Sequence, residues 1–454
     1  LQGKSATVVG AGQTPGEKYS ARIEQGRVIS RTTNVAVSTP PTFYNGLADG
    51  VIFDSWNETE WVAPANMKFT MGAVPTGEPH VTDVPYMVQS HCITPETATS
   101  SHYFSGFSRI FQPRRYGGAE GNLVDGVEIL RSIGQGCGST AWIVVQNILH
   151  NLMLANWPRQ AQDEVWGSTP DVLISGILIP GIGKATKVDG GFQLSGRWPF
   201  VSGVEIADWV IFTGDCISGE EKEERHFILH KDQIKILDTW YTIGLRGSSS
   251  QDVLLERVFV PEHMTVTDEQ LKGHGRSPGS KLNTSWHYQI PAYALFGAFI
   301  GTAALGIAEA AVDHYIENAR KRVSTMTGNS LASYATQQVK VAEAKAAVLT
   351  ARQLITSVVQ EAQDIFQNGG TSTVEDRTRW RALATFAGRL STSAVNLVLE
   401  AGGGGVIYER NPIARYFTDM TVANRHITQN WDFNGSMYGR VLLGLPAGLP
   451  PLED

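Results

Sequence analysis

Cysteine is scarce in this chain of 454 residues, which contains only Cys92, Cys137 and Cys216. They lie far apart, and none belongs to a Cys-x-x-Cys or Cys-x-His pair. This pattern argues against a disulfide framework, a structural zinc site or a complete iron–sulfur cluster. Because disulfide-free proteins are typical of reducing compartments, we expect a cytoplasmic protein.

Long runs of one charge are also missing. The 37 basic and 44 acidic residues are interspersed and give a net charge of −7. Nucleic acids and anionic membranes need a basic patch, so neither is an expected partner. The N-terminus has no signal-peptide pattern. The most apolar run, residues 293–311, contains Gly and Thr and continues into a charged segment, which predicts a buried bundle helix and no membrane span.

Two regions have the alternation and turn residues of β-structure. Residues 1–107 are rich in β-branched and aromatic residues separated by Gly, Pro and Asn, which predicts a mostly antiparallel sheet. Residues 171–262 return to strands punctuated by Gly and Asp, which predicts a compact β-domain.

The remaining regions have helical periodicity. A helix is expected from Ser139 as N-cap to Pro158, with an apolar stripe on one face. Long helices are expected beyond residue 290, at residues 291–322, 335–368 and 374–402. A last helix is expected to begin at Asn411-Pro412. The 42% hydrophobic content is enough for substantial cores, so we expect a multidomain α+β protein.

Several motifs beyond residue 108 resemble a known family. FQPRRYGGAEG, GCGSTAW, LRGSSSQDVLLERVFVP and NPIARYFTDMTVANRH together are similar to the acyl-CoA dehydrogenase fold, and more closely to its flavin-dependent monooxygenase branch. The resemblance implies a helical segment, a central β-domain and a C-terminal four-helix bundle. It also implies a homotetramer that takes reduced FMN or FAD from a separate NAD(P)H-dependent flavin reductase. Such an oxygenase component uses O2, through a C4a-hydroperoxyflavin, to hydroxylate a phenolic or other aromatic substrate.

Residues 1–107 resemble a different family. HCITPETATSSHYF and WVAPANM are similar to the catalytic domain of Rieske-type oxygenases of the vanillate demethylase kind. The chain has neither the Cys-x-His and Cys-x-x-His pair for a cluster nor the Asp-x-x-His-x-x-x-x-His run for iron, so we expect no metal. This fragment stands where the flavin family has its first helices. The expected parts are 1–107, a shortened helical domain 108–170, a β-domain 171–270 and a bundle 271–454.

The segment GRWPFVSG, residues 196–203, carries the first candidate site residues. The resemblance puts Ser202 where a hydroxyl bonds to flavin N5, which makes it a catalytic and cofactor-binding candidate. Phe200 falls near the aromatic residue that packs on the flavin, and Trp198 is a further cofactor-binding candidate. A hydrogen bond at N5 slows proton loss from that atom and so keeps the flavin peroxide from collapsing.

Two histidines are the candidate bases. His426 lies seven residues after Asp419 and is expected on the same face of the last long helix, where the family has a histidine above the flavin. His150 is expected beside the apolar stripe of its helix, and phenol hydroxylases of the family have a substrate-contacting histidine at this spacing. A neutral imidazole can accept a phenol proton. Ser175 matches a serine that faces substrate in the same relatives.

Two loops supply the other candidates. In LRGSSSQD, Arg246 and Ser248 offer donors to a flavin edge or phosphate. In TSWHYQIPAY, Trp286 and Tyr288 are candidate walls of an aromatic substrate cavity, together with His287. AGGGGVIY is expected to be a flexible turn between helices, and VVGAGQTPG does not have the spacing of a dinucleotide fingerprint.

Three alternatives stay open from the sequence. One is an acyl-CoA dehydrogenase-like FAD oxidoreductase, although HITQNWDFNG has no glutamate for the base of that reaction. A second is a relative that oxygenates sulfur or nitrogen. A third is an inactive fusion product whose flavin pocket is incomplete.

Overall fold

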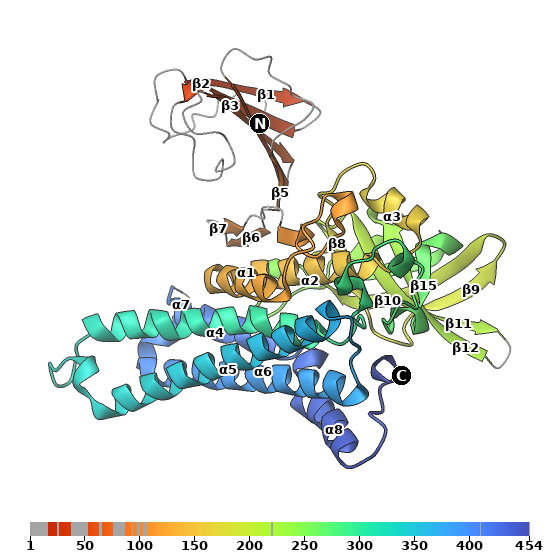
Figure 1. The fold of residues 1–454 in the computed structure, drawn as a ribbon. Helices are drawn as coiled ribbons and strands as arrows, with labels where there is room; N and C mark the ends of the chain where they lie inside the picture. The colour runs from red at the N-terminus through yellow and green to blue at the C-terminus, as the bar shows by residue number, and fades with distance from the viewer. Residues whose placement is uncertain are drawn as a thin grey trace. The chain divides into compact units, whose positions relative to one another are not determined.

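The computed structural model describes residues 17–24, 27–37, 53–62, 66–75, 87–92, 94–97, 100–102, 107–218, 221–408 and 410–453. The chain divides into two compact units, Leu1–Gly106 and Phe107–Asp454. Figure 1 shows the elements of both units.

The first unit contains a five-stranded sheet in the order β1-β2-β3-β4-β5, and every neighbouring pair is antiparallel. Its strands are Glu17–Glu24, Arg27–Val37, Phe53–Val62, Asn66–Pro75 and Met87–Cys92. A short pair follows, β6 Thr94–Thr97 with β7 Ser100–His102. The mostly antiparallel structure predicted for this region is therefore confirmed. The motif at residues 8–16 lies outside the described residues.

The second unit contains an eight-stranded sheet in the order β13-β14-β10-β9-β11-β12-β15, and β8 joins β11 in parallel. The strands are β8 Ile174–Ile177, β9 Lys184–Val188, β10 Gly191–Val201, β11 Trp209–Ser218, β12 Glu221–His230, β13 Lys235–Leu237, β14 Gln251–Pro261 and β15 Thr265–Thr267. The predicted β-domain is confirmed. The fully buried side chains of Leu194, Phe212 and Phe227 lie in the core of this sheet.

The helices of the second unit lie beside this sheet (Figure 1). They are α1 Leu123–Gly136, α2 Gly138–Leu154, α3 Arg159–Trp166, α4 Phe296–Lys321, α5 Ala335–Gln367, α6 Val374–Gly402, α7 Pro412–Ala423 and α8 Trp431–Leu442. Helices α4, α5 and α6 pack against one another as the predicted bundle. The AGGGGVIY stretch forms the end of α6 and a 3-10 helix, Gly403–Ile407.

Among the described residues, two helical segments are long and apolar enough to cross a membrane by length and composition, α4 and residues 374–407. In α4, 89% of the apolar stretch is buried inside the protein. The run at residues 293–311 thus forms a core helix of the bundle, as its Gly and Thr content predicts.

The prediction of one long last helix is wrong beyond Ala423. Helix α7 ends there with Asn424 as its C-cap, and α8 begins only after Asn430. Between them, His426 has extended backbone angles and caps a short 3-10 helix, Ile427–Gln429. Its side chain accepts a hydrogen bond from the backbone N–H of Thr428, which satisfies a donor that a continuous helix would have used.

The predicted start of the helix at Ser139 is also wrong, because Cys137 is the N-cap and Ser139 lies inside α2. Every residue of α2 except Leu152 is buried, so this helix has no solvent face and His150 does not lie at a rim. Helix α1, which precedes it, lies within the predicted helical domain 108–170, but its bounds were not predicted, because its three glycines weaken the helical pattern. The central position of α2, in contact with α1, α4 and β8, makes it the natural support for a site.

Candidate active site

Ser202 follows β10 at a point where several elements converge. Its Oγ accepts a hydrogen bond from Trp142 Nε1 of α2 at 3.1 Å and lies 2.8 Å from Ser250 Oγ. Ser250 Oγ lies a further 2.8 Å from Ser248 Oγ. On the other side, Ser175 Oγ in β8 donates to the Ser202 carbonyl oxygen at 2.5 Å. The structure therefore brings the predicted Ser202, Ser175 and Ser248 together, and all three are buried.

The loops around Ser202 contain strained backbone. Phe200, Leu245 and Ser249 have φ angles of 63°, 48° and 43°, the left-handed region that residues other than glycine seldom adopt. Such residues cost of order 1–3 kcal/mol each and persist only where surrounding contacts hold them. Leu245 is held by its N–H, which donates to Asp419 Oδ1 of α7 at 2.6 Å, and by its carbonyl, which accepts from Trp240 Nε1 at 3.0 Å. The serine loop is thus fixed to the helix α7.

His150 lies on α2, 1% exposed, with its ring edge toward Phe296 at a centroid distance of 6.3 Å. A Cβ added at Gly176 would lie 2.7 Å from His150 Nε2, so the glycine beside Ser175 makes room for the imidazole. Burial lowers the pKa of His150 to about 4, against the opposing effect of backbone groups of Ile174 and Gln146. Its Nδ1 has no hydrogen-bond partner of good geometry among the described residues. At neutral pH the ring is therefore uncharged and has a lone pair available.

The lowered pKa of His150 predicts a loss of stability in acid. Its pKa is about 4 in the folded protein and 6.5 ordinarily, so the unfolded chain binds the proton more readily. The stabilising contribution is complete above pH 6.5 and is lost as the pH falls toward 4, by roughly 3 kcal/mol. Urea unfolding of the protein and of His150→Gln between pH 4.5 and 7.5 measures this. We expect a shallower pH dependence of the unfolding free energy in this variant, and the pH dependence of the unmodified protein in the partly exposed control His230→Gln. Equal slopes in all three proteins would contradict the buried neutral histidine.

His426 lies close to Trp142, with ring centroids 5.6 Å apart in an edge-to-face arrangement. The backbone N–H of Thr428 donates to its Nδ1 at 3.3 Å, and Thr428 Oγ1 lies 2.9 Å from the same atom. A backbone N–H can only donate, so in the neutral ring the proton is on Nε2. Burial and the nearby Arg381 guanidinium lower the pKa of His426 to about 4. Because the side chain is partly exposed, its neutrality is less firmly held than that of His150.

We call Ser202, Ser175, Ser248, Ser250 and Trp142 the Ser202 group. Phe200 and Arg246 lie at its outer edge. Phe200 is 59% exposed and makes an edge-to-face contact with Trp240 at 6.4 Å. Arg246 is exposed and begins the short 3-10 helix that contains Ser248. An exposed aromatic ring beside buried hydroxyls is a surface that a flat, partly polar ring system can cover.

The other three candidates lie elsewhere. Trp198 is fully buried in the sheet, where its Nε1 donates to Thr213 O at 3.0 Å and its ring packs on Phe212. Trp286 stacks on His287, whose Nε2 lies 2.7 Å from Gly121 O. Tyr288 donates to Phe111 O at 3.2 Å, and its pKa is raised by burial. No hydrogen bond or ring contact recorded for the described residues joins these side chains to the Ser202 group.

Three important side chains were not identified as site residues from the sequence. Trp142 was assigned only to the apolar stripe of its helix, Ser250 only to a serine-rich turn, and Asp419 only to a helix face. The indole N–H of a buried tryptophan needs an acceptor, which is the one signal that could have singled out Trp142. The identity of that acceptor depends on the tertiary fold, because Ser202 lies 60 residues away in sequence.

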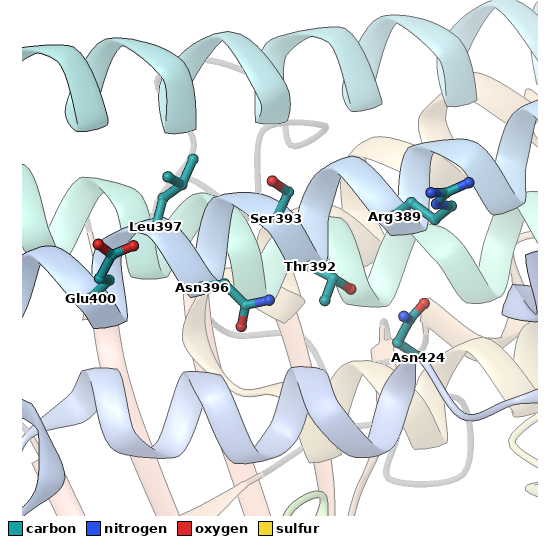
Figure 2. A pocket seen from close by; sticks show the side chains of 7 residues that line it. All are labelled: Arg389, Thr392, Ser393, Asn396, Leu397, Glu400 and Asn424. Atoms are coloured by element: carbon teal, nitrogen blue, oxygen red, sulfur yellow. The ribbon is translucent and has the colours of Figure 1, made fainter.

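An open pocket of about 400 Å³ lies between α6 and the end of α7, as Figure 2 shows. Its lining residues are Arg389, Thr392, Ser393, Asn396, Leu397, Glu400 and Asn424. None of them belongs to the Ser202 group. The Ser202 group, where Trp142 joins the buried Ser202 hydroxyl to the neutral His426 ring, is the candidate site.

Glu224, His226 and Asp268 form a separate group. The atoms with which these side chains could bind a metal ion lie within 4.8 Å of one another. His226 Nε2 lies 3.5 Å from Asp268 Oδ1 and 3.4 Å from Tyr293 Oη. Burial raises the pKa of Glu224 against the lowering effect of His226, and the nearby Asp268 and Asp215 carboxylates raise it further. Tyr293 connects this group to the buried guanidinium of Arg381, which donates to the Tyr293 carbonyl at 3.1 Å.

The residues around Ser202 fit a flavin. The isoalloxazine ring is flat and apolar on its faces and polar along one edge, and the exposed Phe200 ring lies two residues from the Ser202 hydroxyl. Side-chain hydroxyls and fixed backbone N–H groups of the strained loop supply the polar partners.

Comparison with known proteins supports both resemblances. The model of the acyl-CoA dehydrogenase C-terminal domain matches residues 298–431, and that of the vanillate O-demethylase oxygenase C-terminal domain matches residues 6–123. The second match confirms the Rieske-type resemblance of the N-terminal region.

Among curated proteins, the chain is 31% identical over 354 residues to the oxygenase component of FADH(2)-dependent resorcinol hydroxylase from Rhizobium sp. strain MTP-10005, with coverage of 75% of this chain and 85% of the relative. It is 29% identical over 354 residues to the flavin-dependent monooxygenase oxygenase subunit HsaA of Rhodococcus jostii RHA1, with coverage of 78% and 92%.

Solved structures agree. The crystal structure of 3-HSA hydroxylase from Rhodococcus sp. RHA1 matches with a TM-score of 0.72 and 29% identity, covering 75% of this chain and 88% of that one. XiaF from Streptomyces sp. in complex with FADH2 and glycerol matches with a TM-score of 0.72 and 25% identity, covering 76% and 87%. These relatives decide against the dehydrogenase alternative. The chain belongs to the flavin-dependent monooxygenases of the acyl-CoA dehydrogenase fold, as an oxygenase component.

Proposed function

We propose that this protein hydroxylates a phenolic substrate with O2 and reduced flavin. The observation that carries this proposal is the group of buried hydroxyls at Ser202 and Ser250, which contacts Trp142, against whose ring the neutral His426 packs. Relatives named as resorcinol hydroxylase and p-hydroxyphenylacetate 3-hydroxylase support a phenol as the substrate class.

We propose that the flavin is FAD, delivered in its reduced form by a separate NAD(P)H-dependent reductase. The support is a relative named as FADH(2)-dependent and a structural neighbour in complex with FADH2. When bound, reduced flavin supplies the two electrons that activate O2. Phe200, the Ser202 group and the exposed Arg246 are the residues that would hold the flavin.

His150 has the role of base. Its neutral imidazole can accept the phenol proton, which raises the electron density of the ring carbon to be hydroxylated. Ser175 donates its own proton to the Ser202 carbonyl, so its oxygen is left as an acceptor for a substrate hydroxyl. His426, with its proton on Nε2, acts as a neutral hydrogen-bond donor to oxygen. This role differs from the base function that the sequence suggested for His426.

We also propose that the protein is a homotetramer. Large apolar side chains are exposed near its C-terminus, on or next to α8: Trp431, Phe433, Leu442, Leu443 and Leu445. An exposed apolar group of this kind is typical of a subunit interface. Size-exclusion chromatography with light scattering tests it, and a monomer at micromolar concentration would contradict it.

The function is tested with the full chain, a flavin reductase, NADH and either FAD or FMN. Resorcinol and 4-hydroxyphenylacetate are suitable first phenols, with dibenzothiophene as a sulfur-containing comparison. We expect a product that has gained one oxygen atom from a phenol, detected by mass spectrometry, and none when the oxygenase is omitted. Binding of neither flavin would support the inactive-fusion alternative, and oxidation of the sulfur compound alone would contradict the phenol assignment.

A further inference from the structure

Arg381 is a buried cation in helix α6, with an exposed fraction of 4%. Two hydrogen bonds fix its guanidinium: Nε donates to Asn434 Oδ1 at 3.1 Å, and Nη1 donates to the Tyr293 carbonyl oxygen at 3.1 Å. Burial lowers the pKa of Arg381 to about 10, so the group is still charged at neutral pH. The guanidinium is therefore a fixed positive charge inside the protein.

The two groups that hold this guanidinium are both uncharged. Only Tyr293 opposes the effect of burial on the pKa of Arg381, and no carboxylate of the described residues does so. Water can hydrogen-bond to a guanidinium, but it does not balance the charge. A buried charge is strongly unfavourable unless an opposite charge accompanies it. The surroundings of Arg381 are therefore suited to a ligand that brings an anion.

Two sets of contacts place Arg381 beside the candidate site. Its charge lies close enough to His426 to lower the pKa of that imidazole. In the other direction, the centroid of the Tyr293 ring lies 6.0 Å from that of Phe296, which lies 6.3 Å from that of His150. His426 and Tyr293 are partly exposed, so they offer surface to a ligand. Two aromatic rings thus separate the guanidinium from the proposed base.

The acidic group at Asp268 does not balance the charge of Arg381. Asp268 Oδ1 lies 3.5 Å from His226 Nε2, which lies 3.4 Å from Tyr293 Oη. These carboxylates are therefore next to the hydroxyl end of Tyr293, whereas Arg381 contacts its backbone carbonyl. A ligand anion at Arg381 would lie at the other end of this side chain.

We infer that Arg381 binds a carboxylate of the substrate, so that the preferred substrate is a phenol with an acidic side chain. This inference rests on the proposed function and deepens it. The phenol hydroxyl meets His150, the aromatic ring packs on Phe296 and Tyr293, and the carboxylate pairs with the guanidinium. The two hydrogen bonds use two of the five N–H donors of Arg381, and a planar guanidinium matches a carboxylate with the others.

The test compares phenolic acids with their own amides, which have nearly the same shape and no charge. 4-Hydroxybenzoate, 4-hydroxyphenylacetate and 3-(4-hydroxyphenyl)propionate differ in the distance from the hydroxyl to the carboxylate. The dissociation constants of these acids and their amides are measured at neutral pH by anaerobic equilibrium dialysis against the full chain with reduced FAD. We expect at least one acid to bind about 30-fold more tightly than its amide, equivalent to about 2 kcal/mol.

Arg381→Gln is expected to remove this preference, so that each acid binds no better than its amide. Arg381→Lys is expected to keep part of it, because an ammonium keeps the charge and loses the planar fork; this variant also serves if Arg381→Gln does not fold. Arg389→Gln, at an exposed arginine of the same helix, is the matched control and is expected to keep the full preference. General loosening would weaken acid and amide alike, so the ratio reports the charge pair.

Equal binding of every acid and its amide by the unmodified protein overturns the inference, and so does a preference that Arg381→Gln retains. If the amides or resorcinol are then still hydroxylated, the proposed function stands without the inference. Hydroxylation of none of the acids, amides or resorcinol overturns both.

Discussion

His150→Ala is expected to lower the rate of phenol hydroxylation by about 100-fold or more, while the affinity for reduced flavin stays the same. A positioned general base contributes of this order to proton transfer. His150 is buried and uncharged, and its Nδ1 has no other partner of good geometry among the described residues. Single-turnover measurements with pre-reduced flavin and O2 give the rate without the contribution of the reductase.

The control for this prediction is a second phenol that needs no base. A phenol acidic enough to be ionised at pH 8 has no proton for His150 to remove, so His150→Ala is expected to lose much less activity on it. The variant His230→Ala, at a partly exposed histidine outside the Ser202 group, is expected to behave as the unmodified protein on both phenols. An equal loss on the neutral and the ionised phenol would show that His150 supports the fold of the pocket and is not the base.

Ser202→Ala is expected to uncouple oxygen consumption from hydroxylation. The variant removes the hydroxyl that meets the flavin edge, and it leaves Trp142 Nε1–H and the Ser250 hydroxyl without their acceptor. The freed donors, and water that enters beside the smaller alanine, replace the contact of the Ser202 hydroxyl with the flavin edge. We expect this replacement to favour release of hydrogen peroxide over hydroxylation of the substrate. We expect the yield of hydroxylated product per O2 to fall about ten-fold, a change of about 1.4 kcal/mol in the competition between the two outcomes.

This second prediction is measured as the ratio of product to hydrogen peroxide in the presence and absence of catalase. Ser132→Ala is the matched control, because Ser132 is exposed and its hydroxyl donates to Glu128 O in its own helix. Product yield in Ser202→Ala equal to that of the control would exclude Ser202 from the oxygen chemistry.

The regular parts of the fold were predictable because their patterns are local. The period of the bundle helices and the turn residues of the central sheet are properties of short segments, and α5 at Ala335–Gln367 begins where the sequence places it. The helix boundaries failed where a side chain competes with the backbone. His426 accepts a hydrogen bond from the backbone N–H of Thr428, and this contact allows the chain to leave the helix between α7 and α8.

The candidate site was predictable only in part. Ser202, Ser175 and His150 were found through a family resemblance, and the structure joins Ser175 to Ser202 and places His150 beside Gly176. Trp142 and Ser250 were missed as site residues because their roles are pairings between segments far apart in the chain. Residues such as Trp198 show the opposite error. Its motif lies beside Ser202 in sequence, and strand alternation would put the two side chains on one face. The strand has a register shift between Trp198 and Val201, however, and the Trp198 ring is enclosed in the sheet.

The most direct test of the central claim is a turnover under 18O2. The full chain, a reductase, NADH, FAD and a phenol are incubated with the labelled gas, and the product is analysed by mass spectrometry. We predict one 18O atom in each hydroxylated product molecule and none from labelled water. Consumption of O2 that yields only hydrogen peroxide with every phenol and either flavin, or a product whose new oxygen comes from water, would contradict the assignment of this protein as a flavin-dependent aromatic hydroxylase.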